Sequence, residues 1–396
     1  MERLPKKAAG VSSHIFEDQL LVFSERAQRL YRFNESAAFI WCCNEDYMSF
    51  DEIVVALMSS YGLGRKQACD DLNQVIEEWI TQGLLAEESF EFKNQSGPEA
   101  LPLTQEDYFT TPPPMPAEWN SFTFSLVERV FRLRCADKEI WNSIIDIFGH
   151  LVSSSLKPSV FVDLVESAGR CWIYCDGTPI VHDIPREHSI GRLTQEVLRI
   201  AYKQCHFLIA VHGAVLSSGK QCILLSGQSG SGKSTLTAAL LKDGFGYFTD
   251  DVALVDRSTR NIIPIPVSLR LKEGSWEAVS AIYSDFAGRP WHWLPLGEKV
   301  RYLPPPHGRF ASRLSDGFPV RWIIFPEYSP DKPSASASIS RVEALDRLQL
   351  AGYDTGGYLD RTKIVELLAW MKTIDCYEME VGRLDEAVKI VRGLTT

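Results

Sequence analysis

The sequence lacks any long hydrophobic run. Its longest apolar stretch, residues 207–216, is about ten residues long and is interrupted by His212, whereas a transmembrane helix needs about 18 apolar residues. The N-terminus carries Lys6 and Lys7, but no apolar segment of a signal peptide follows them. We therefore expect no membrane partner and a cytoplasmic location.

A disulfide framework and a zinc ribbon are also missing. The nine cysteines are an odd number, and no two of them are spaced as Cys-x-x-Cys. Cys171 and Cys175 lie four residues apart, but no second Cys/His pair completes four ligands. The pattern predicts a protein whose cysteines are reduced.

An excess of positive charge is absent as well. The 396 residues contain 41 Lys+Arg against 51 Asp+Glu, a net charge of −10. A general nucleic-acid binder needs basic residues to neutralise phosphates, so no nucleic-acid partner is expected. The length suggests two or three domains of about 100–200 residues each.

The chain divides at a Pro-rich linker, residues 94–118, which contains three consecutive prolines. We expect four segments. They are a recognition domain over 1–93, the linker over 94–118, an α/β lobe over 119–204 and a P-loop catalytic domain over 205–396. The lobe contains a predicted helix whose apolar face carries Trp141, Ile144, Ile145 and Phe148.

The first segment reads as a small hairpin followed by three helices. Residues 15–23 form the hairpin around a polar turn, and the helices are expected near 35–43, 50–61 and 65–82. Ser49 and Glu52 have the spacing of a capping box at the start of the second helix. An extended piece follows at 84–86. This order predicts an α+β winged-helix domain.

Charge decides what this winged helix binds. Residues 1–93 hold 16 acidic and 9 basic side chains, which gives 9 − 16 = −7. DNA binding is therefore disfavoured, and a peptide that adds a strand to the sheet edge is preferred. Residues 30–38, Tyr61, Asp70-Asp71 and 83–85 resemble the PqqD family. The resemblance implies recognition of the leader of a ribosomally made precursor peptide. A winged helix used only for assembly is the alternative.

A phosphate-binding motif follows in the second half of the chain. The run Gly-x-x-x-x-Gly-Lys-Ser lies between a predicted strand, 221–226, and a predicted helix, 233–242. Its backbone N–H groups and the helix N-terminus form an anion site. Lys233 would reach the β- and γ-phosphates and Ser234 would bind Mg²⁺. The residues expected to bind nucleotide here are Gly227, Gln228, Ser229, Gly230, Ser231, Gly232, Lys233, Ser234 and Thr235.

A pair of carboxylates suits the same reaction. Asp250 and Asp251 begin 17 residues after Lys233, and they could supply a further Mg²⁺ contact and a general base. The chain has no Leu-Ser-Gly-Gly-Gln and no Asn-Lys-x-Asp, which excludes transporter ATPases and GTPases. We expect His212-Gly213 to end or interrupt the strand that begins at residue 207. His212 is either a core histidine or a functional one.

Together these residues resemble the HPr kinase/phosphorylase family, which has a P-loop core akin to phosphoenolpyruvate carboxykinase. The matching pieces are 212–215, 227–234, Asp250-Asp251, 264–272 and 323–328. The resemblance implies an α/β kinase that uses ATP and Mg²⁺ to phosphorylate a serine hydroxyl, as relatives in lasso-peptide clusters are thought to do.

One position departs from that family. HPr kinases place an aspartate directly after the first P-loop glycine as general base, where this chain has Gln228, whose amide cannot accept a proton. The base would then be Asp250, Asp251 or His212, unless the reaction relies on positioning and Mg²⁺ alone.

Cations that would bind phosphates are expected in the same segment. Arg270 and Lys272 are the preferred candidates. The stretch 299–321 holds five basic residues against one acid, and it is either a solvated loop or an arginine clamp. We interpret Trp291 and Trp293 as core or interface aromatics.

The sequence thus predicts an ATP- and Mg²⁺-dependent serine/threonine kinase of a leader-bound precursor peptide, with catalytic residues drawn from His212, Lys233, Asp250 and Asp251. Asp250, Asp251 and Ser234 are the expected metal ligands. A nucleotide-gated peptide chaperone without phosphotransfer is one alternative, and a kinase of a small molecule or free protein is another. Other peptide-modifying enzymes and a second copy of the chain are further expected partners.

Overall fold

The computed structural model describes residues 3–86, 113–153, 155–203, 205–294, 297–354 and 358–395, which fold as two compact units. The first unit takes in the described parts of Met1–Tyr108 and Gly357–Lys372, and the second those of Phe109–Gly356 and Thr373–Thr396. Residues 357–372 thus lie in the first unit, although the expected segment 205–396 contains them. The four segments otherwise stay a prediction, and residues 94–112 of the linker lie outside the described residues.

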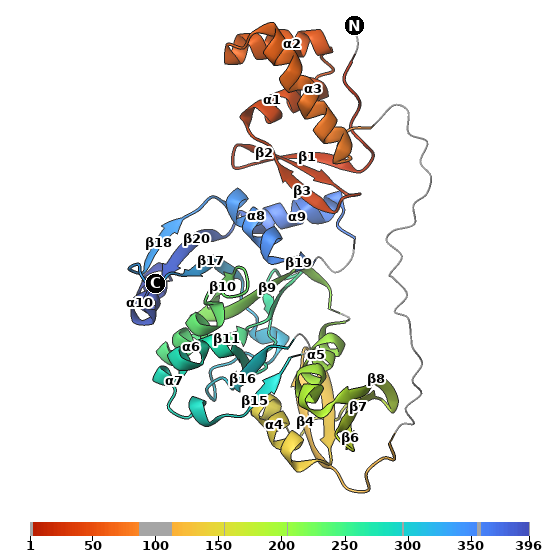
Figure 1. Cartoon of the computed structure of the whole chain (residues 1–396), viewed down its shortest axis with the longest axis vertical. Coiled ribbons are helices and arrows are strands. Elements are labelled where there is room, and N and C mark those ends of the chain that lie inside the picture. Colours follow the sequence, from red (N-terminus) through yellow and green to blue (C-terminus); the bar gives the residue numbers. More distant parts are fainter. Residues whose placement is uncertain are drawn as a thin grey trace. The chain divides into compact units, whose positions relative to one another are not determined.

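The first unit contains a three-stranded antiparallel sheet in the order β1-β2-β3 (Figure 1). Its strands are β1 (Val11–Phe16), β2 (Gln19–Ser24) and β3 (Arg29–Arg32). Its helices are α1 (Glu35–Glu45), α2 (Phe50–Tyr61), α3 (Arg65–Thr81) and, from far along the chain, α9 (Arg361–Met371). The predicted hairpin and three helices are therefore present.

Local signals in the sequence place the ends of these helices. Asn34 caps α1 by accepting a hydrogen bond from the N–H of Ala37 at 2.8 Å. The predicted capping box is formed, because Glu52 Oε2 accepts hydrogen bonds from the N–H and the hydroxyl of Ser49, each at 2.7 Å. Gly62 ends α2 in the left-handed region, with φ of 68°.

The sheet of the first unit buries both of its faces. Leu20 and Val22 pack with α1, α2 and α3 in a core that contains Trp41 and Trp79. Because side chains alternate along a strand, Leu21 and Phe23 project to the opposite face, and both are buried. Helix α9 belongs to this unit and is buried at Ile364, Leu367, Leu368, Trp370 and Met371.

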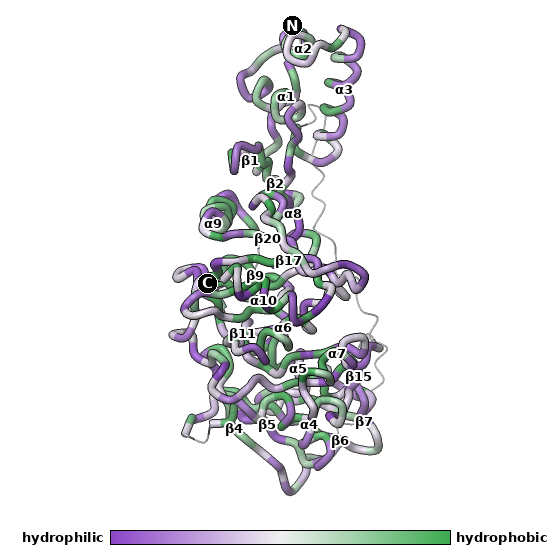
Figure 2. The backbone as a smooth tube through the Cα atoms, turned by 90° about the vertical axis from the view of Figure 1, so that its left-hand side faces the viewer, coloured by the Kyte–Doolittle hydropathy of each residue, from purple (hydrophilic) through white to green (hydrophobic). Residues whose placement is uncertain are grey.

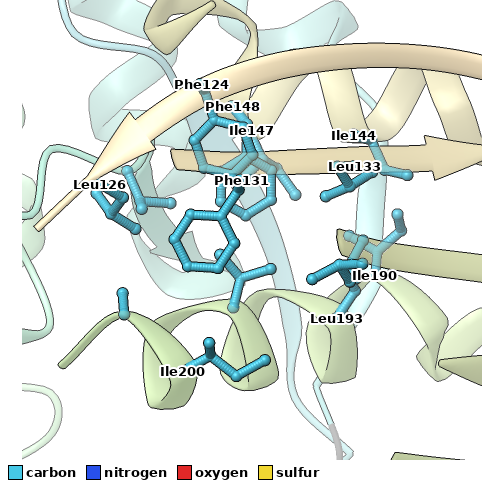
Figure 3. Packing of buried hydrophobic residues seen from close by; sticks show 14 of the residues in the cluster. Phe124, Leu126, Phe131, Leu133, Ile144, Ile147, Phe148, Ile190, Leu193 and Ile200 are labelled. Atoms are coloured by element: carbon cyan, nitrogen blue, oxygen red, sulfur yellow. The ribbon is translucent and has the colours of Figure 1, made fainter. Parts of the chain in front are cut away.

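The second unit begins with a five-stranded sheet in the order β4-β5-β6-β7-β8. Its strands are β4 (Asn120–Leu126), β5 (Arg129–Cys135), β6 (Val160–Ser167), β7 (Arg170–Cys175) and β8 (Thr178–Pro185). Helices α4 (Lys138–Phe148) and α5 (Ser189–Tyr202) pack on one face of it. Figure 3 shows Phe124, Phe131 and Phe148 meeting Ile144 and Leu193 in this core.

One expectation for α4 is wrong. Ile145 is 45% exposed, whereas Ile140, Ile144, Ile147 and Phe148 are buried. The apolar face of the helix is therefore rotated toward Ile147 and away from Ile145.

A larger mixed sheet forms the centre of the second unit, with the order β13-β12-β9-β10-β17-β20-β18, and β11 and β19 also pair with β9. Strands β10, β17 and β20 are parallel, and the other pairs are antiparallel. Its strands are β9 (Phe207–Ser218), β10 (Gln221–Ser226), β11 (Gly246–Thr249), β12 (Val252–Asp256), β13 (Ile262–Ile263), β17 (Val320–Tyr328), β18 (Ala335–Ser338), β19 (Tyr353–Asp354) and β20 (Asp375–Val381). Figure 2 shows the apolar character of β9 and β17.

Helices and a small sheet complete this unit. The helices are α6 (Lys233–Asp243), α7 (Trp276–Ile282), α8 (Arg341–Ala351) and α10 (Leu384–Leu394). The small sheet has the order β14-β16-β15, with β14 (Leu269–Lys272), β15 (Trp291–Trp293) and β16 (Lys299–Leu303). Strands and helices alternate around a mixed sheet, so the predicted α/β class, preceded by an α+β domain, is confirmed.

Strand β9 corrects a second expectation. It runs without a break through His212 and Gly213 and pairs with β10 over its whole second half. Gly213 keeps the strands close, since a Cβ atom there would lie 2.6 Å from the carbonyl oxygen of Leu225. The glycine therefore permits close pairing and does not end the strand.

Two further expectations concern disulfide bonds and membrane-spanning helices. All nine cysteines are free thiols, as predicted. Within the described ranges, no helix combines the length and apolar character that crossing a bilayer requires.

Candidate functional site

The phosphate-binding loop connects β10 to α6 in the second unit, in the predicted strand–loop–helix order. Gly230 and Gly232 both have φ of 88°, a backbone conformation that other residues rarely adopt. Helix α6 begins directly after the loop at Lys233 and ends at Gly244, which has φ of 108°. The loop N–H groups and the start of α6 together favour a bound anion.

Two lysines lie over this loop. Lys233 Nζ donates to the carbonyl oxygens of Gly227 and Gln228 at 2.5 and 2.8 Å, and burial lowers its pKa, with the nearby charge of Lys272 as a second cause. Lys272 Nζ donates to Ser229 Oγ at 2.9 Å and to Glu298 Oε1 at 2.7 Å. Both ammonium groups are therefore at the mouth of the anion site.

Asp250 and Asp251 follow β11 and have different surroundings. Asp250 Oδ2 accepts a hydrogen bond from the N–H of Arg270 at 2.6 Å, and Oδ1 lies 3.0 Å from the hydroxyl of Tyr247. Dense packing, reinforced by the charge of Asp251, raises the pKa of Asp250 to about 7. Asp251 Oδ1 instead accepts a hydrogen bond from Arg270 Nη2 at 2.6 Å.

His212 stands beside this pair on β9. Its Nδ1 lies 3.0 Å from the carbonyl oxygen of Asp251 and 3.6 Å from Oδ1 of the same residue. Burial lowers the pKa of His212, against the opposing effect of Asp251. The His212 side chain is 45% exposed. A purely core position for it is excluded.

A single cavity of about 1330 Å³ brings the site together. The predicted site residues that line it are His212, Ser229, Gly230, Gly232, Lys233, Ser234, Thr235, Asp250, Asp251, Arg270 and Lys272. Gly227, Gln228 and Ser231 belong to the loop but do not line the cavity. The Ser231 hydroxyl is buried without a hydrogen-bond partner among the described residues.

The residues that line the cavity fall into two groups, called arms here according to the elements that carry them. One arm contains the carboxylate pair and residues Gln195, Leu294 and Glu298. The other arm is formed by residues of α6, α7 and α10, and α6 packs against both other helices. Its apolar residues are Ala239, Ala278, Ala281, Ile282, Leu384 and Val388, and its charged residues are Lys242, Asp243, Asp385 and Lys389.

The oxygen atoms that line the cavity can be compared with the ligands that Mg²⁺ requires. No group of three or more His, Cys, Asp or Glu gathers as a metal site in the part of the chain that the structure describes. Mg²⁺ at phosphate sites commonly uses one or two protein oxygens and completes its shell with phosphate and water. Ser234 and Asp251 offer such oxygens in the cavity, whereas both Asp250 oxygens already have partners. The residues fit a shared site of this kind.

The basic stretch 299–321 does not contribute to the cavity. None of Lys299, Arg301, Arg309, Arg313 and Arg321 lines it. Lys299 Nζ lies 4.9 Å and 5.3 Å from the ring centroids of Trp291 and Trp293, and Arg301 stacks over Trp276 at 4.2 Å. The geometry therefore does not support the arginine clamp.

Sequence reasoning did not select three functional candidates. Tyr247 lies three residues before Asp250, but nothing in its local pattern indicates that its hydroxyl reaches this carboxylate. Gln195 and Glu298 come from segments without a motif, and only the tertiary fold places them in the cavity.

Comparisons with known proteins bear mainly on the first unit. Residues 19–85 match the family model "Coenzyme PQQ synthesis protein D (PqqD)". No curated protein matches the chain.

Two solved structures are similar to parts of the chain. "TbiB1 in Complex with the TbiA(beta) Leader Peptide" is 21% identical, covers 22% of this chain and 99% of its own, and has a TM-score of 0.20. The HPr(Ser) kinase/phosphatase from Coxiella burnetii is 14% identical, covers 47% of this chain and 89% of its own, and has a TM-score of 0.22. At these TM-scores neither likeness carries a functional argument. The family match stands by itself, and residues 19–85 form a PqqD domain.

Proposed function

We propose that the protein is an ATP- and Mg²⁺-dependent kinase that phosphorylates a Ser or Thr hydroxyl of a precursor peptide held by its PqqD domain. The observation that carries this proposal is the convergence of a P-loop, two lysines and a carboxylate pair on one cavity. Phosphoryl transfer requires mainly positioning and charge neutralisation, which these groups can supply.

The two arms of the cavity suggest how ATP lies. The loop N–H groups and Lys233 would hold the β-phosphate. The γ-phosphate would lie beside Lys272 and next to the carboxylate pair, which would contact it through Mg²⁺. The nucleoside would then extend into the arm between α6, α7 and α10, whose small apolar residues suit a flat base. The acceptor hydroxyl would enter from the arm that contains Gln195 and Leu294.

The peptide would bind to the sheet of the first unit. Strand β2 lies in the middle, so β1 and β3 are its edges, and in the described chain neither edge strand pairs with a further strand. The central strand β2 is buried on both faces of the sheet, so strand addition at an edge is the route that we propose for a peptide. Holding the leader there would raise the effective concentration of the acceptor residue near the cavity to about the millimolar range.

The decisive test uses the full chain, γ-labelled ATP, Mg²⁺ and the precursor peptide encoded beside its gene. We expect label on a Ser or Thr of the peptide, and we expect Lys233→Ala to abolish the transfer. Bound ATP without any labelled peptide would refute the kinase proposal. Transfer that is unaffected by removal of the peptide's leader would refute the role of the PqqD domain and favour a free protein or small molecule as substrate.

A second function has two observations in its favour. The amide of Gln228 cannot act as a base, and Lys233 is hydrogen-bonded to the carbonyls of its own loop. A nucleotide-gated chaperone that presents the peptide to another enzyme would need nucleotide binding only. The same assay distinguishes the two, because a chaperone would bind ATP and peptide and leave the peptide unlabelled.

A further inference from the structure

Transfer of a phosphoryl group to a hydroxyl releases a proton, so the proposed kinase needs an acceptor for that proton in its cavity. Gln228 cannot provide one. Five carboxylates and one histidine line the cavity, namely Asp243, Asp250, Asp251, Glu298, Asp385 and His212. Their hydrogen bonds show which of them is free to accept a proton.

Three of the five carboxylates are poorly suited. Asp250 has a partner on each oxygen, the hydroxyl of Tyr247 and the N–H of Arg270. Asp243 accepts a hydrogen bond from Arg392 Nε at 2.9 Å, and Asp385 accepts one from Arg383 Nε at 3.2 Å. Asp243 lies on α6 and Asp385 on α10, and each is thus engaged by an arginine.

Asp251 and His212 are also engaged by other groups of the site. Asp251 is held by Arg270 and is the better of the two aspartates for the metal, so its negative charge would be engaged there. His212 has its Nδ1 beside the carbonyl oxygen of Asp251. His212 therefore remains a rival that an experiment must separate.

Glu298 has the geometry that the others lack. The Leu294 N–H donates to the Glu298 carbonyl at 2.8 Å, and the preceding Gly297 has φ of 82°. Glu298 Oε1 accepts a hydrogen bond from Lys272 Nζ, and the same ammonium donates to Ser229 on the phosphate loop. In the described structure Oε2 accepts no hydrogen bond, and Glu298 lines the cavity with a side chain that is 43% exposed.

We propose that Glu298 is the general base of this site, an inference that rests on the proposed kinase function. The acceptor O–H gives its proton to Glu298 Oε2 while its oxygen forms the new bond to the γ-phosphorus. The bond from that phosphorus to the oxygen bridging the β-phosphate breaks, and its electron pair leaves with ADP. Glu298 then returns the proton to water.

Lys272 connects the base to the phosphate. An ammonium group has three donors, so Lys272 can keep Glu298 while it donates to a γ-phosphate oxygen. That arrangement fixes the carboxylate next to the transferred group, which is the positioning that general base catalysis requires.

The test measures transfer from γ-labelled ATP to the precursor peptide by the full chain and its variants. We expect Glu298→Gln to lower kcat by about 10²- to 10⁴-fold, with the ATP dissociation constant changed less than about threefold. Glu277→Gln is the matched control, because Glu277 is an exposed acid on α7 that does not line the cavity, and it should behave as wild type. Equal thermal midpoints of both variants exclude a folding defect.

A double variant separates the base from a residue that merely holds Lys272. If Glu298 acts only through the lysine, Glu298→Gln adds nothing to Lys272→Met. If it is the base, the double variant is at least about tenfold slower than Lys272→Met alone.

Three results would overturn the proposal. A raised ATP KM with unchanged kcat in Glu298→Gln would leave Glu298 a holder of Lys272. Unchanged kcat in Glu298→Gln together with its loss in His212→Gln would assign the base to His212. A wild-type protein that binds ATP and transfers nothing would show that the kinase function itself is wrong, and the base role would be discarded with it.

Discussion

Gln28 and Leu359 exchange two hydrogen bonds although 331 positions of the chain separate them. Gln28 Nε2 donates to the Leu359 carbonyl at 3.0 Å, and the Leu359 N–H donates to Gln28 Oε1 at 2.6 Å. Nearby, the Arg361 N–H donates to Glu25 Oε1 at 3.3 Å. The turn between β2 and β3 is thus hydrogen-bonded to the residues at the start of α9. The unit that contains the PqqD domain is therefore built from two distant parts of the chain.

This arrangement predicts that changes in α9 destabilise the PqqD domain. Ile364→Ala removes a fully buried side chain and should lower the free energy of unfolding of the first unit by about 2–5 kcal/mol. Val365→Ala, one position along the same helix and 52% exposed in wild type, should cost much less. Hydrogen exchange of the β2 amides measures the effect, and equal protection in both variants would contradict it.

A second prediction concerns the pH dependence of this unit. His14 lies on the sheet face that includes Leu21, and burial, with Arg361 as a second cause, lowers its pKa below the ordinary 6.5. The unfolded chain therefore binds the proton first as the pH falls, so the contribution of His14 to stability is full above 6.5 and is lost below it. His14→Gln should make the fall in stability between pH 7 and 5 shallower than in wild type. Urea titrations at several pH values measure this difference, and parallel curves would exclude the role of His14.

The sequence predicts well those features that short-range patterns determine. The capping box at Ser49 and Glu52, the glycine-rich loop before Lys233 and the Asp250-Asp251 pair each lie within a few residues, so local chemistry reveals them. The contact between Gln28 and Leu359 depends on how distant segments pack, and no local pattern encodes it.

The same reason explains the expectations that were wrong. The helical period of α4 identified an apolar face, but whether Ile145 or Ile147 is buried depends on the rotation of the helix against the sheet. A glycine within an apolar run commonly indicates the end of a strand, so the sequence alone misplaces Gly213. Only the close approach of β10 explains why a glycine is needed there. Glu298 became a candidate only when the fold placed it against Lys272.

A third prediction tests Lys272 at the phosphate loop. Lys272→Ala removes an ammonium that donates to Ser229, and it should weaken ATP binding by about tenfold, which corresponds to about 1.4 kcal/mol. Lys332→Ala is the control, because Lys332 is an exposed lysine that pairs with Glu380 and does not line the cavity. Isothermal titration with ATP measures both. An unchanged dissociation constant in Lys272→Ala would place the triphosphate elsewhere.

Tyr247 provides a fourth prediction, on stability. Its buried hydroxyl donates to the carbonyl oxygen of Val267 at 2.8 Å and lies 3.0 Å from Asp250 Oδ1. Tyr247→Phe leaves both oxygens without this partner, and we expect a loss of about 1–3 kcal/mol of unfolding free energy. Tyr283→Phe should cost less, since the Tyr283 hydroxyl donates to Ala238 at a partly buried position. Chemical denaturation distinguishes them, and equal losses would show that the contact with Asp250 contributes nothing.

The last prediction separates the two aspartates by their partners. Asp251 has only one oxygen held by Arg270, so its other oxygen is available to a metal, whereas both oxygens of Asp250 bind groups of the protein. Asp251→Asn should therefore raise the Mg²⁺ concentration that half-saturates transfer by about tenfold or more, with partial recovery at high Mg²⁺. Asp250→Asn should instead leave the Mg²⁺ requirement nearly unchanged, because both oxygens of Asp250 already have partners in the protein. Magnesium titrations of both variants measure the contrast. If Asp250→Asn shifted the Mg²⁺ requirement and Asp251→Asn did not, Asp250 would be the metal ligand, and its hydrogen bonds to Tyr247 and Arg270 would have to rearrange when Mg²⁺ and ATP bind.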